Sequence, residues 1–339
     1  MSSEALSRYY AILEGEETAR YLMTKRTGVP IDLGAEDDVL WKAHERALLK
    51  TDGSGQSGLL DLKIELANRM LKSCELCERK CGANRSAGER GHCGVLEARV
   101  NSEFLHMGEE PELVPSYTIF FSGCTFECVF CQNWDISTRP EAGVEIGPKV
   151  LARKIEAKNP DEGCGDSTGV FTRAKNVNWV GGDPTSNLPF ILEVLRECRA
   201  NIPQVWNSNM YLSERSMKLL DGVIDVYLTD YKYGNDSCAS RLSKVQNYLR
   251  IVQRNHKMAR QHAEMIVRHL VLPGHVECCT RPALTWISEN LEGAKVNVMA
   301  QYRPEHNASE YPEISHPLRM AEFRTAMEIA ENLGLDLSD

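Results

Sequence analysis

The stretch "YTIFFSGCTFECVFCQNWDIS", residues 117–137, places Cys124, Cys128 and Cys131 directly after a run of aromatic and β-branched residues. A disulfide joins two thiols, and a closed structural zinc site takes four ligands. Soft thiolates grouped in a short segment favour zinc or an iron–sulfur cluster. A cubane 4Fe-4S cluster held by only three cysteines keeps one iron free of protein ligands. The stretch therefore predicts a metal centre with one vacant position, on a loop at the end of a strand.

Two other interpretations of the three cysteines stay open at this point. Residues spaced i, i+4 and i+7 share one face of a helix, where buried cysteines are common. A zinc ion with a fourth ligand from elsewhere in the chain is the second alternative.

Strand patterns alternate with helical patterns on the C-terminal side of this loop. The expected strands are 116–121, 176–182, 203–209, 225–232, 263–274 and 295–304. The expected helices are 147–158, 188–200, 213–221, 237–256, 282–291 and 317–333. This alternation predicts right-handed parallel βαβ units. Six units are too few to close an eight-stranded barrel, so we expect an α/β fold with a partial (β/α)6 TIM-like barrel. In such folds the chemistry gathers at the C-terminal ends of the strands.

The N-terminal third lacks the alternation of strand and helix patterns. Residues 1–72 read as helical, with apolar faces through Leu40 and His44 and through Leu62 and Leu66. The segment "KTDGSGQSG" between these faces reads as a flexible connection. Residues 73–112 are rich in cysteine and glycine, with short strand-like pieces such as "GVLEARV". We therefore expect three parts: a helical region (1–72), a cysteine-rich metal-binding module (73–112) and the partial barrel (113–339).

Composition narrows the class of protein. The 339 residues include 42% hydrophobic residues, and 39 basic against 48 acidic side chains give a net charge of −9. This charge makes a nucleic-acid partner unlikely. No apolar run has the length of a membrane span, and the first residues show no secretory hydrophobic segment. We expect a soluble, cytoplasmic protein without a membrane partner, in which the twelve cysteines are not a disulfide framework.

Four further motifs follow expected strands. "WVGGDPTSN" contains Gly181, Gly182 and Asp183, and glycines let a backbone approach a ligand closely. Taken alone, it is also an ordinary turn. Asp230 and Lys232 in "LTDYKYGND" share one face of a strand, although a surface ion pair would look the same. The remaining two stretches are "VWNSNMY" (205–211) and "IVRHLVLPGH" (266–275).

The C-x3-C-x2-C loop after the first barrel strand resembles the signature of the radical S-adenosylmethionine (SAM) superfamily. The setting "GCxxxCxxCQN" is similar to activating enzymes of the pyruvate formate-lyase type. The resemblance covers roughly residues 115–310, and the cysteine-rich prefix departs from the familiar activases. It looks like a subgroup of activase-like radical SAM proteins that carry such a prefix.

The resemblance implies a role for each motif. The three cysteines would be the catalytic cluster ligands, Phe130 would lie against the adenine of SAM, and the Gly-Gly-Asp-Pro turn would receive its amino group. Asp183 replaces the glutamate of the family pattern, and Arg303 stands where the activases carry histidine, beside a matching Tyr302. His269 would point away from the site. The cofactor-binding residues implied in this way are Phe130, Asn133, Gly181, Gly182, Asp183, Asn207, Ser208, Asn209, Asp230, Lys232, Arg268, Leu270, Val271 and Arg303.

A second group of cysteines lies upstream. "CELCERKCGANRSAGERGHC" supplies Cys74, Cys77, Cys81 and Cys93 in a polar segment that is not typical of a core. Four thiolates can close a tetrahedral zinc site or hold a second 4Fe-4S cluster. The spacing does not separate these two options.

The resemblance also implies an activity. SAM would bind the free iron, flavodoxin or ferredoxin would deliver an electron, and reductive cleavage would give methionine and a 5′-deoxyadenosyl radical that abstracts hydrogen, in an anaerobic setting. The subgroup favours activation of a partner protein at a glycine. Radical modification of a peptide or a small anionic metabolite, with Arg303 as an anchor, is the alternative. A non-catalytic zinc-binding interaction protein is a third, remote one.

Some residues fall outside these motifs. The five scattered cysteines, Cys164, Cys198, Cys238, Cys278 and Cys279, read as small buried hydrophobes. The adjacent pair Cys278–Cys279 is equally open to a core or a redox role. His275 and His306 lie near strand ends, where solvation in a loop is the simpler expectation than contact with substrate.

Overall fold

A computed structural model describes residues 4–49, 55–159 and 173–338. Its centre is an eight-stranded sheet in the order β10-β9-β8-β7-β6-β5-β4-β3. The strands are β3 (Val100–His106), β4 (Ser116–Phe121), β5 (Asn176–Gly181), β6 (Gln204–Ser208), β7 (Val226–Asp230), β8 (Glu264–Leu270), β9 (Lys295–Met299) and β10 (Asp336–Leu337). Strands β4 to β10 are parallel, and β3 pairs antiparallel with β4.

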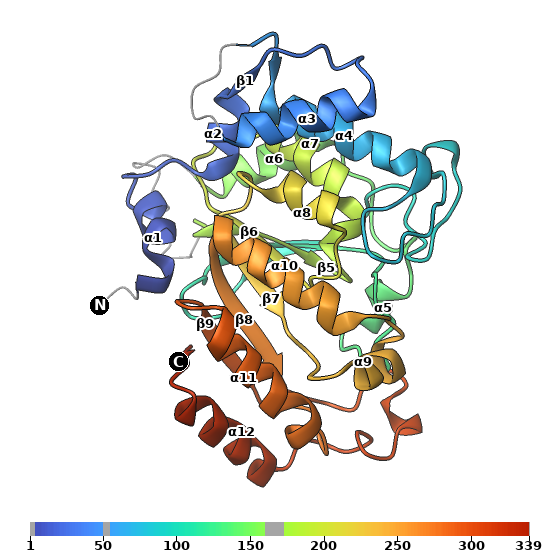
Figure 1. Ribbon diagram of the computed structural model, residues 1–339, viewed down its shortest axis with the longest axis vertical. Coiled ribbons are helices and arrows are strands. Elements are labelled where there is room, and N and C mark those ends of the chain that lie inside the picture. Colours follow the sequence, from blue (N-terminus) through green and yellow to red (C-terminus); the bar gives the residue numbers. More distant parts are fainter. Residues whose placement is uncertain (1–3, 50–54, 160–172, 339) are drawn as a thin grey trace.

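The six expected parallel strands, β4 to β9, are present in sequence order, which confirms an α/β fold with a mostly parallel sheet. Within the described residues β3 and β10 do not pair with each other, so the sheet is open. The helices that follow the strands cover its outer side (Figure 1). They are α6 (Pro148–Ala157), α7 (Leu188–Glu197), α8 (Glu214–Leu220), α9 (Asp236–Ser243), α10 (Tyr248–His262), α11 (Arg281–Asn290) and α12 (Met320–Asn332).

Two local expectations need correction. The helix expected over 237–256 is two helices, α9 and α10, because Lys244 and Asn247 adopt left-handed backbone angles (φ +54° and +51°) that interrupt it. The strand expected in "GVLEARV" begins only at Val100, where pairing with β4 begins, and continues to His106.

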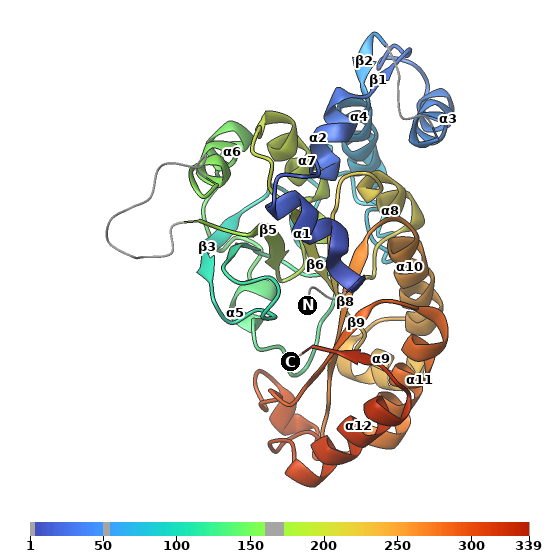
Figure 2. The same cartoon turned by 90° about the vertical axis from the view of Figure 1, so that its left-hand side faces the viewer.

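The N-terminal residues form α1 (Ser7–Leu13), α2 (Arg20–Arg26), α3 (Asp37–Leu48), α4 (Leu59–Met70) and a small hairpin of β1 (Gly28–Val29) and β2 (Ser57–Gly58). Leu40 and His44 are buried on α3, and Leu62 and Leu66 on α4, as their spacing predicts. Of the flexible connection expected at 50–58, residues 50–54 lie outside the described ranges. Figure 2 shows the hairpin, α3 and α4 at one end of the molecule.

Helix α1 fills the inner side of the sheet. Leu6 and Tyr9 pack with Leu113 against interior residues of β6 to β8, such as Leu228 and Ile266. The side chain of Glu264 accepts hydrogen bonds from the backbone N–H groups of Arg8 and Tyr9, at 2.7 and 2.8 Å. The inner side is therefore closed near the start of β8, and the open space lies toward the C-terminal strand ends. Within the described part of the chain, no helix has the length and apolar character needed to span a bilayer.

Candidate functional site

The three cysteines of the first barrel loop are free thiols at the C-terminal end of β4, around the short helix α5 (Trp134–Ser137). The backbone N–H of Phe126 lies 3.3 Å from Cys124 Sγ, and the hydroxyl of Ser243 lies 2.9 Å from Cys128 Sγ. Ser137 Oγ lies 3.4 Å from Cys131 Sγ. Each thiol thus has a hydrogen-bonding neighbour, as thiolate ligands of a cluster require.

These thiols fit an iron–sulfur cluster. Burial raises the pKa of the Cys128 thiol to about 12, and it raises that of Cys124, where the carboxyl of Asp183 adds to the rise. Thiolates at these half-buried positions are costly unless a cation compensates them. Among the described residues, no three of these ligand atoms lie within 4.8 Å of one another. Three thiolates are the ligand set of a cubane that keeps one iron free of protein, whereas a closed zinc site takes four ligands.

A cleft of about 580 Å³ opens beside the thiols. Its lining includes Cys93, Cys124, Cys128, His306 and Tyr311. The segment after β9 returns over the loop, since the backbone N–H of Asn307 donates to Val129 O at 2.8 Å. Space for a ligand therefore adjoins two of the three predicted cluster ligands.

The Gly-Gly-Asp-Pro turn packs directly on the cysteine loop. A Cβ atom on Gly182 would lie 2.1 Å from Gly123 O, and one on Gly181 would lie 2.2 Å from Phe121 O. The backbone N–H of Asp183 donates to Gly123 O at 3.1 Å. Both glycines are thus required by the contact between the ends of β5 and β4, in addition to any approach of a ligand.

Asp183 is buried and uses its carboxylate within the protein. Oδ1 accepts from Thr185 N at 2.9 Å, and Oδ2 accepts from Asn209 N and Ser208 Oγ, each at 3.0 Å. Burial raises its pKa against the effect of these donors. The side chain of Asn209 in turn donates to Thr125 Oγ1 at 3.0 Å and lies 3.9 Å from Cys124 Sγ. Asp183 therefore positions the end of β6 against the cysteine loop.

Asp230 and Lys232 form an ion pair of 2.6 Å between Oδ2 and Nζ. Burial lowers the pKa of Lys232, but Asp230 and then Cys128 outweigh it, so that the pKa is raised. Lys232 therefore remains a cation beside the cysteine loop. Its ion pair with Asp230 is largely shielded from solvent, unlike the surface ion pair considered as the alternative.

Asn207, another predicted SAM-binding residue, is buried on β6.

Arg268 is directed at two glutamates that the sequence did not indicate. Its Nε donates to Glu110 Oε1 at 2.6 Å, and Nη2 bonds both Glu110 and Glu109. Asn297 donates to the same Glu110 oxygen at 2.9 Å. Most of the Arg268 hydrogen-bond donors that were expected to contact SAM are thus paired with Glu109 and Glu110.

The remaining predicted residues differ in burial. Phe130 is buried with its ring centroid 5.9 Å from that of Tyr302. Val271 is fully buried, and its N–H donates to Met299 O at 3.1 Å, whereas Leu270 is half-buried. Asn133 and Arg303 are exposed, and Arg303 has no side-chain hydrogen bond or ion pair with any described residue. His269 is buried away from the cleft, between Tyr231 O and Thr280 Oγ1.

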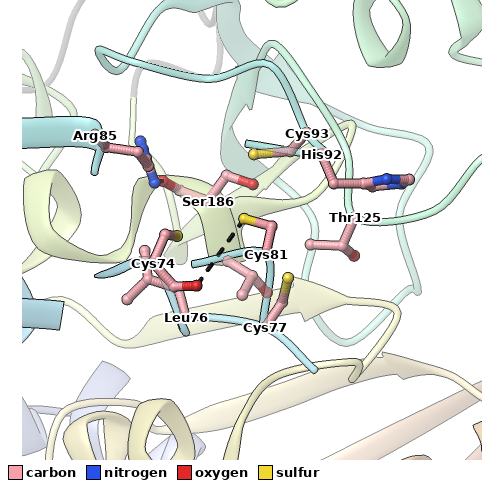
Figure 3. A pocket seen from close by; sticks show the side chains of 10 residues that line it. Cys74, Leu76, Cys77, Cys81, Arg85, His92, Cys93, Thr125 and Ser186 are labelled. Carbon is pink, nitrogen blue, oxygen red and sulfur yellow. Dashed lines mark hydrogen bonds between the residues drawn. The ribbon is translucent and has the colours of Figure 1, made fainter. Parts of the chain in front are cut away.

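The upstream cysteines surround a second, enclosed space next to the first site. Figure 3 shows the sulfurs of Cys74, Cys77, Cys81 and Cys93 turned toward it. Thr125 and Ser186 line the same space, and Cys93 lines both this space and the 580 Å³ cleft. The cysteine-rich module is therefore in contact with the cysteine loop of the barrel.

The same module is anchored to the barrel by its backbone. Glu78 N donates to Tyr211 O at 3.0 Å, and Ser213 N donates to Leu76 O at 3.1 Å. Arg85 is buried, donates to Ser186 O at 2.9 Å, and keeps an Nε without an acceptor among the described residues. A buried guanidinium with a free donor suits an anionic thiolate-ligated centre.

The scattered cysteines depart in part from the expectation. Cys198 and Cys279 are buried, Cys238 is half-buried and Cys278 is exposed. Cys164 lies outside the described residues. His275 is buried, which corrects the expectation of a solvated loop residue, whereas His306 is exposed and stacks on Trp134.

Sequence reasoning missed Ser243, Thr125, Glu109 and Glu110. Ser243 lies 115 residues from the thiol that it contacts, and no local pattern reports such a contact. The pair of glutamates in "GEEPE" carries no signal of burial, because acidic residues are usually exposed.

Comparisons with known proteins bear on the family. The model of the radical SAM superfamily matches residues 118–287. The uncharacterized protein MJ0674 of Methanocaldococcus jannaschii is 46% identical over 347 residues, which cover 98% of each chain.

Solved structures with partial similarity include QueE from Escherichia coli, at 12% identity and TM-score 0.38, over 72% of this chain and 94% of that chain. Methylornithine synthase aligns at 15% identity and TM-score 0.43, over 98% of this chain and 85% of that chain. TYW1 with a lysine-pyruvate adduct aligns at 13% identity and TM-score 0.40, over 63% of this chain and 73% of that chain. On the match of the family model across half of its length, this chain belongs to the radical SAM superfamily.

Proposed function

We propose that the protein is a radical SAM enzyme that removes a hydrogen atom from a glycine of a partner protein, with Cys124, Cys128 and Cys131 as ligands of a 4Fe-4S cluster. The observation that carries this proposal is that three free thiols gather on one loop at the end of β4, with Cys124 and Cys128 lining the cleft. When bound, the cluster and SAM supply a 5′-deoxyadenosyl radical for hydrogen abstraction.

The side chains around the thiols keep water away and set the local charge. Phe126, Val129 and Phe130 are buried around the cysteines. The ammonium of Lys232 offsets the negative charge of thiolate ligands, and the N–H of Phe126 stabilises Cys124 directly. A dry and preorganised pocket of this kind protects a reactive intermediate from side reactions.

The residues implied for SAM binding surround the same strand ends. Phe130 with Tyr302 offers an apolar surface for the adenine, and the carbonyls of the Gly-Gly-Asp-Pro turn offer acceptors for the ammonium. Asn207, Ser208 and Asn209 would orient the ribose and the carboxylate. Arg268 retains one guanidinium nitrogen, Nη1, for SAM beside its glutamate partners.

The upstream cysteines are the ligands of a second 4Fe-4S cluster in this proposal. Four thiolates turned toward one enclosed space (Figure 3) can hold either zinc or a cubane, and the iron count described below separates the two. A cubane holds its cysteine sulfurs roughly 6 Å apart. Because Thr125 lines the upstream space and directly follows the cluster ligand Cys124, an electron from flavodoxin or ferredoxin would have a short route.

A small anionic substrate is the second candidate, and one observation favours it. Arg303 is exposed on the segment that returns over the cleft, with no side-chain partner among the described residues. A free guanidinium can hold a carboxylate or phosphate by two hydrogen bonds. We prefer the protein-glycine substrate because the cysteine loop resembles that of activating enzymes, which act on a partner protein.

The test is anaerobic reconstitution with iron and sulfide, followed by reduction and assay of 5′-deoxyadenosine formed from SAM. We expect product in the native protein and none in Cys124→Ala. Iron near eight per chain, falling to about four in Cys77→Ser, supports the second cluster. Zinc without any cluster would overturn the enzyme proposal. A carbon-centred radical signal on an added partner protein, absent with small anions, separates the two substrate classes.

A further inference from the structure

A third group of possible metal ligands lies away from both cysteine sites. It consists of Cys238 on α9 and of His275, Cys278 and Cys279 on the turn after β8. One ligand atom from each residue lies within 4.8 Å of all the others. Cys278 Sγ lies 3.3 Å from His275 Nδ1 and 3.9 Å from Cys279 Sγ. We propose that these four residues form a closed zinc site.

The donor set and the spacing both select zinc. Bonds of about 2.3 Å to sulfur and about 2.0 Å to nitrogen place tetrahedral ligand atoms roughly 3.5 to 3.8 Å apart. The measured separations of 3.3 and 3.9 Å bracket this value. A cubane cluster would need sulfurs roughly 6 Å apart, which is wider than the 4.8 Å within which these four ligand atoms lie. Three thiolates with one imidazole are also a usual structural zinc set.

Disulfide chemistry explains the group less well. Three thiols leave one unpaired in any disulfide, and all eleven described cysteines are free. A disulfide would also leave no reason for His275 to be buried with Nδ1 directed at a thiol. A metal ion uses all four side chains.

The two loops are built to approach each other. Asn235 caps α9 by accepting from Cys238 N at 2.7 Å, and its Nδ2 donates to Cys278 O at 2.8 Å. A Cβ atom on Gly234 would lie 2.7 Å from Cys279 O, so only glycine allows this contact. The π-helical turn Val276–Thr280 adds one residue per turn and presents Cys278 and Cys279 on the side facing α9. The chain thus prepares the ligand positions without a metal.

The site has a consequence for the barrel. Helix α9 begins near Cys238 and ends at Ser243, whose hydroxyl contacts Cys128 Sγ and whose carbonyl accepts from Glu127 N at 3.1 Å. A zinc ion with four protein ligands would fix the first turn of α9 to the loop after β8. The metal is structural, and its existence does not depend on the proposed radical chemistry.

The experiment measures metals in the whole reconstituted protein. We expect about one zinc per chain in the native protein. Cys278→Ser is the test variant because Cys278 is exposed, so its loss disturbs packing least. We expect zinc to fall roughly tenfold in this variant with iron unchanged, since Cys278 supplies one of the four ligands that would hold the ion. Cys198→Ser, a change of a free cysteine outside all three groups, is the matched control and should keep both metals.

X-ray absorption at the zinc edge identifies the ligands in the presence of iron. We expect three sulfur neighbours at about 2.3 Å and one nitrogen at about 2.0 Å. Zinc retained in Cys278→Ser, or a native protein grown with zinc that holds none, would overturn the proposal. Zinc lost from Cys77→Ser but not from Cys278→Ser would place it upstream instead. Unchanged iron content in Cys278→Ser shows that the variant is folded, and Cys238→Ser repeats the test from the other loop.

Discussion

The carboxylate of Asp183 accepts a hydrogen bond of 3.0 Å from the backbone N–H of Asn209, and this bond joins the turn after β5 to the end of β6. The same oxygen accepts from Ser208 Oγ. Asn209 continues the connection to the cysteine loop through Thr125. The Gly-Gly-Asp-Pro turn, which the family resemblance assigns to SAM binding, thus also holds the end of β6 and the cysteine loop in place.

We expect Asp183→Ala to lower the free energy of unfolding. The change leaves the N–H groups of Thr185 and Asn209 buried without their acceptor, at about 1 to 3 kcal/mol each. Asp183→Asn, which keeps the shape and one acceptor oxygen, should lose less. Denaturant unfolding of the three proteins under identical conditions checks the order. Equal stability of Asp183→Ala and the native protein would show that the hydrogen bonds to the Asp183 carboxylate do not stabilise the fold.

Gly182→Ala is predicted to separate the turn from the cysteine loop. The new methyl group would meet Gly123 O at 2.1 Å and the Cβ of Cys124 at 3.1 Å. Relief of such a clash by backbone movement costs about 1 to 3 kcal/mol or more. We expect iron per chain to fall after reconstitution. Gly147→Ala is the control, because a Cβ there meets nothing within 4 Å, and it should bind iron normally.

The sequence was informative where a signal is local. The alternation of strands and helices predicted β4 to β9, because buried parallel strands and amphipathic helices each have a recognisable pattern. The two interruptions at Lys244 and Asn247 were missed, since neither residue is a glycine or a proline that marks a break. The cysteine loop is likewise a local signal, because its three cysteines lie within eight residues.

The contacts around the site could not be predicted from the sequence, because they join residues that are far apart in the chain. Arg268 was assigned to SAM from the resemblance, but its glutamate partners lie 158 and 159 residues away. Cys238 on α9 and His275 on the turn after β8 are 37 positions apart, and neither residue alone indicates a metal site. Such groups arise only when parallel strands bring their loops to one edge of the sheet. Only the tertiary structure shows that one ligand atom from each of the four residues of the proposed zinc site lies within 4.8 Å of the others.

Ser243→Ala should change the reduction potential of the cluster without releasing it. The hydroxyl of Ser243 lies 2.9 Å from Cys128 Sγ, and hydrogen bonds to cluster sulfurs stabilise the reduced, more negative state. Its loss should make the potential more negative by tens of millivolts. A redox titration followed by electron paramagnetic resonance measures the change. Ser237→Ala, on an exposed position of the same helix, is expected to leave the potential unaltered.

Lys63 should make stability depend on pH in the alkaline range. It is fully buried on α4, where Nζ contacts Asp221 O at 2.8 Å, Lys218 O at 3.3 Å and His44 Nε2 at 2.9 Å. A neutral amine satisfies all three by donating to the two carbonyls and accepting from the ring. Burial lowers the pKa of Lys63 from 10.5 to about 7.

The direction of the effect follows from proton binding. Between the folded pKa of about 7 and the unfolded value of 10.5, the unfolded chain binds more protons than the folded one. Stability therefore rises with pH across this window, by at most about 1.4 kcal/mol per pH unit for one proton. We expect Lys63→Met to remove this slope, while Lys42→Met, on the exposed side of α3, retains it. Denaturant unfolding at intervals from about pH 7 to about pH 9.5 measures the slopes. Parallel slopes for Lys63→Met and the native protein would show that Lys63 stays charged when folded.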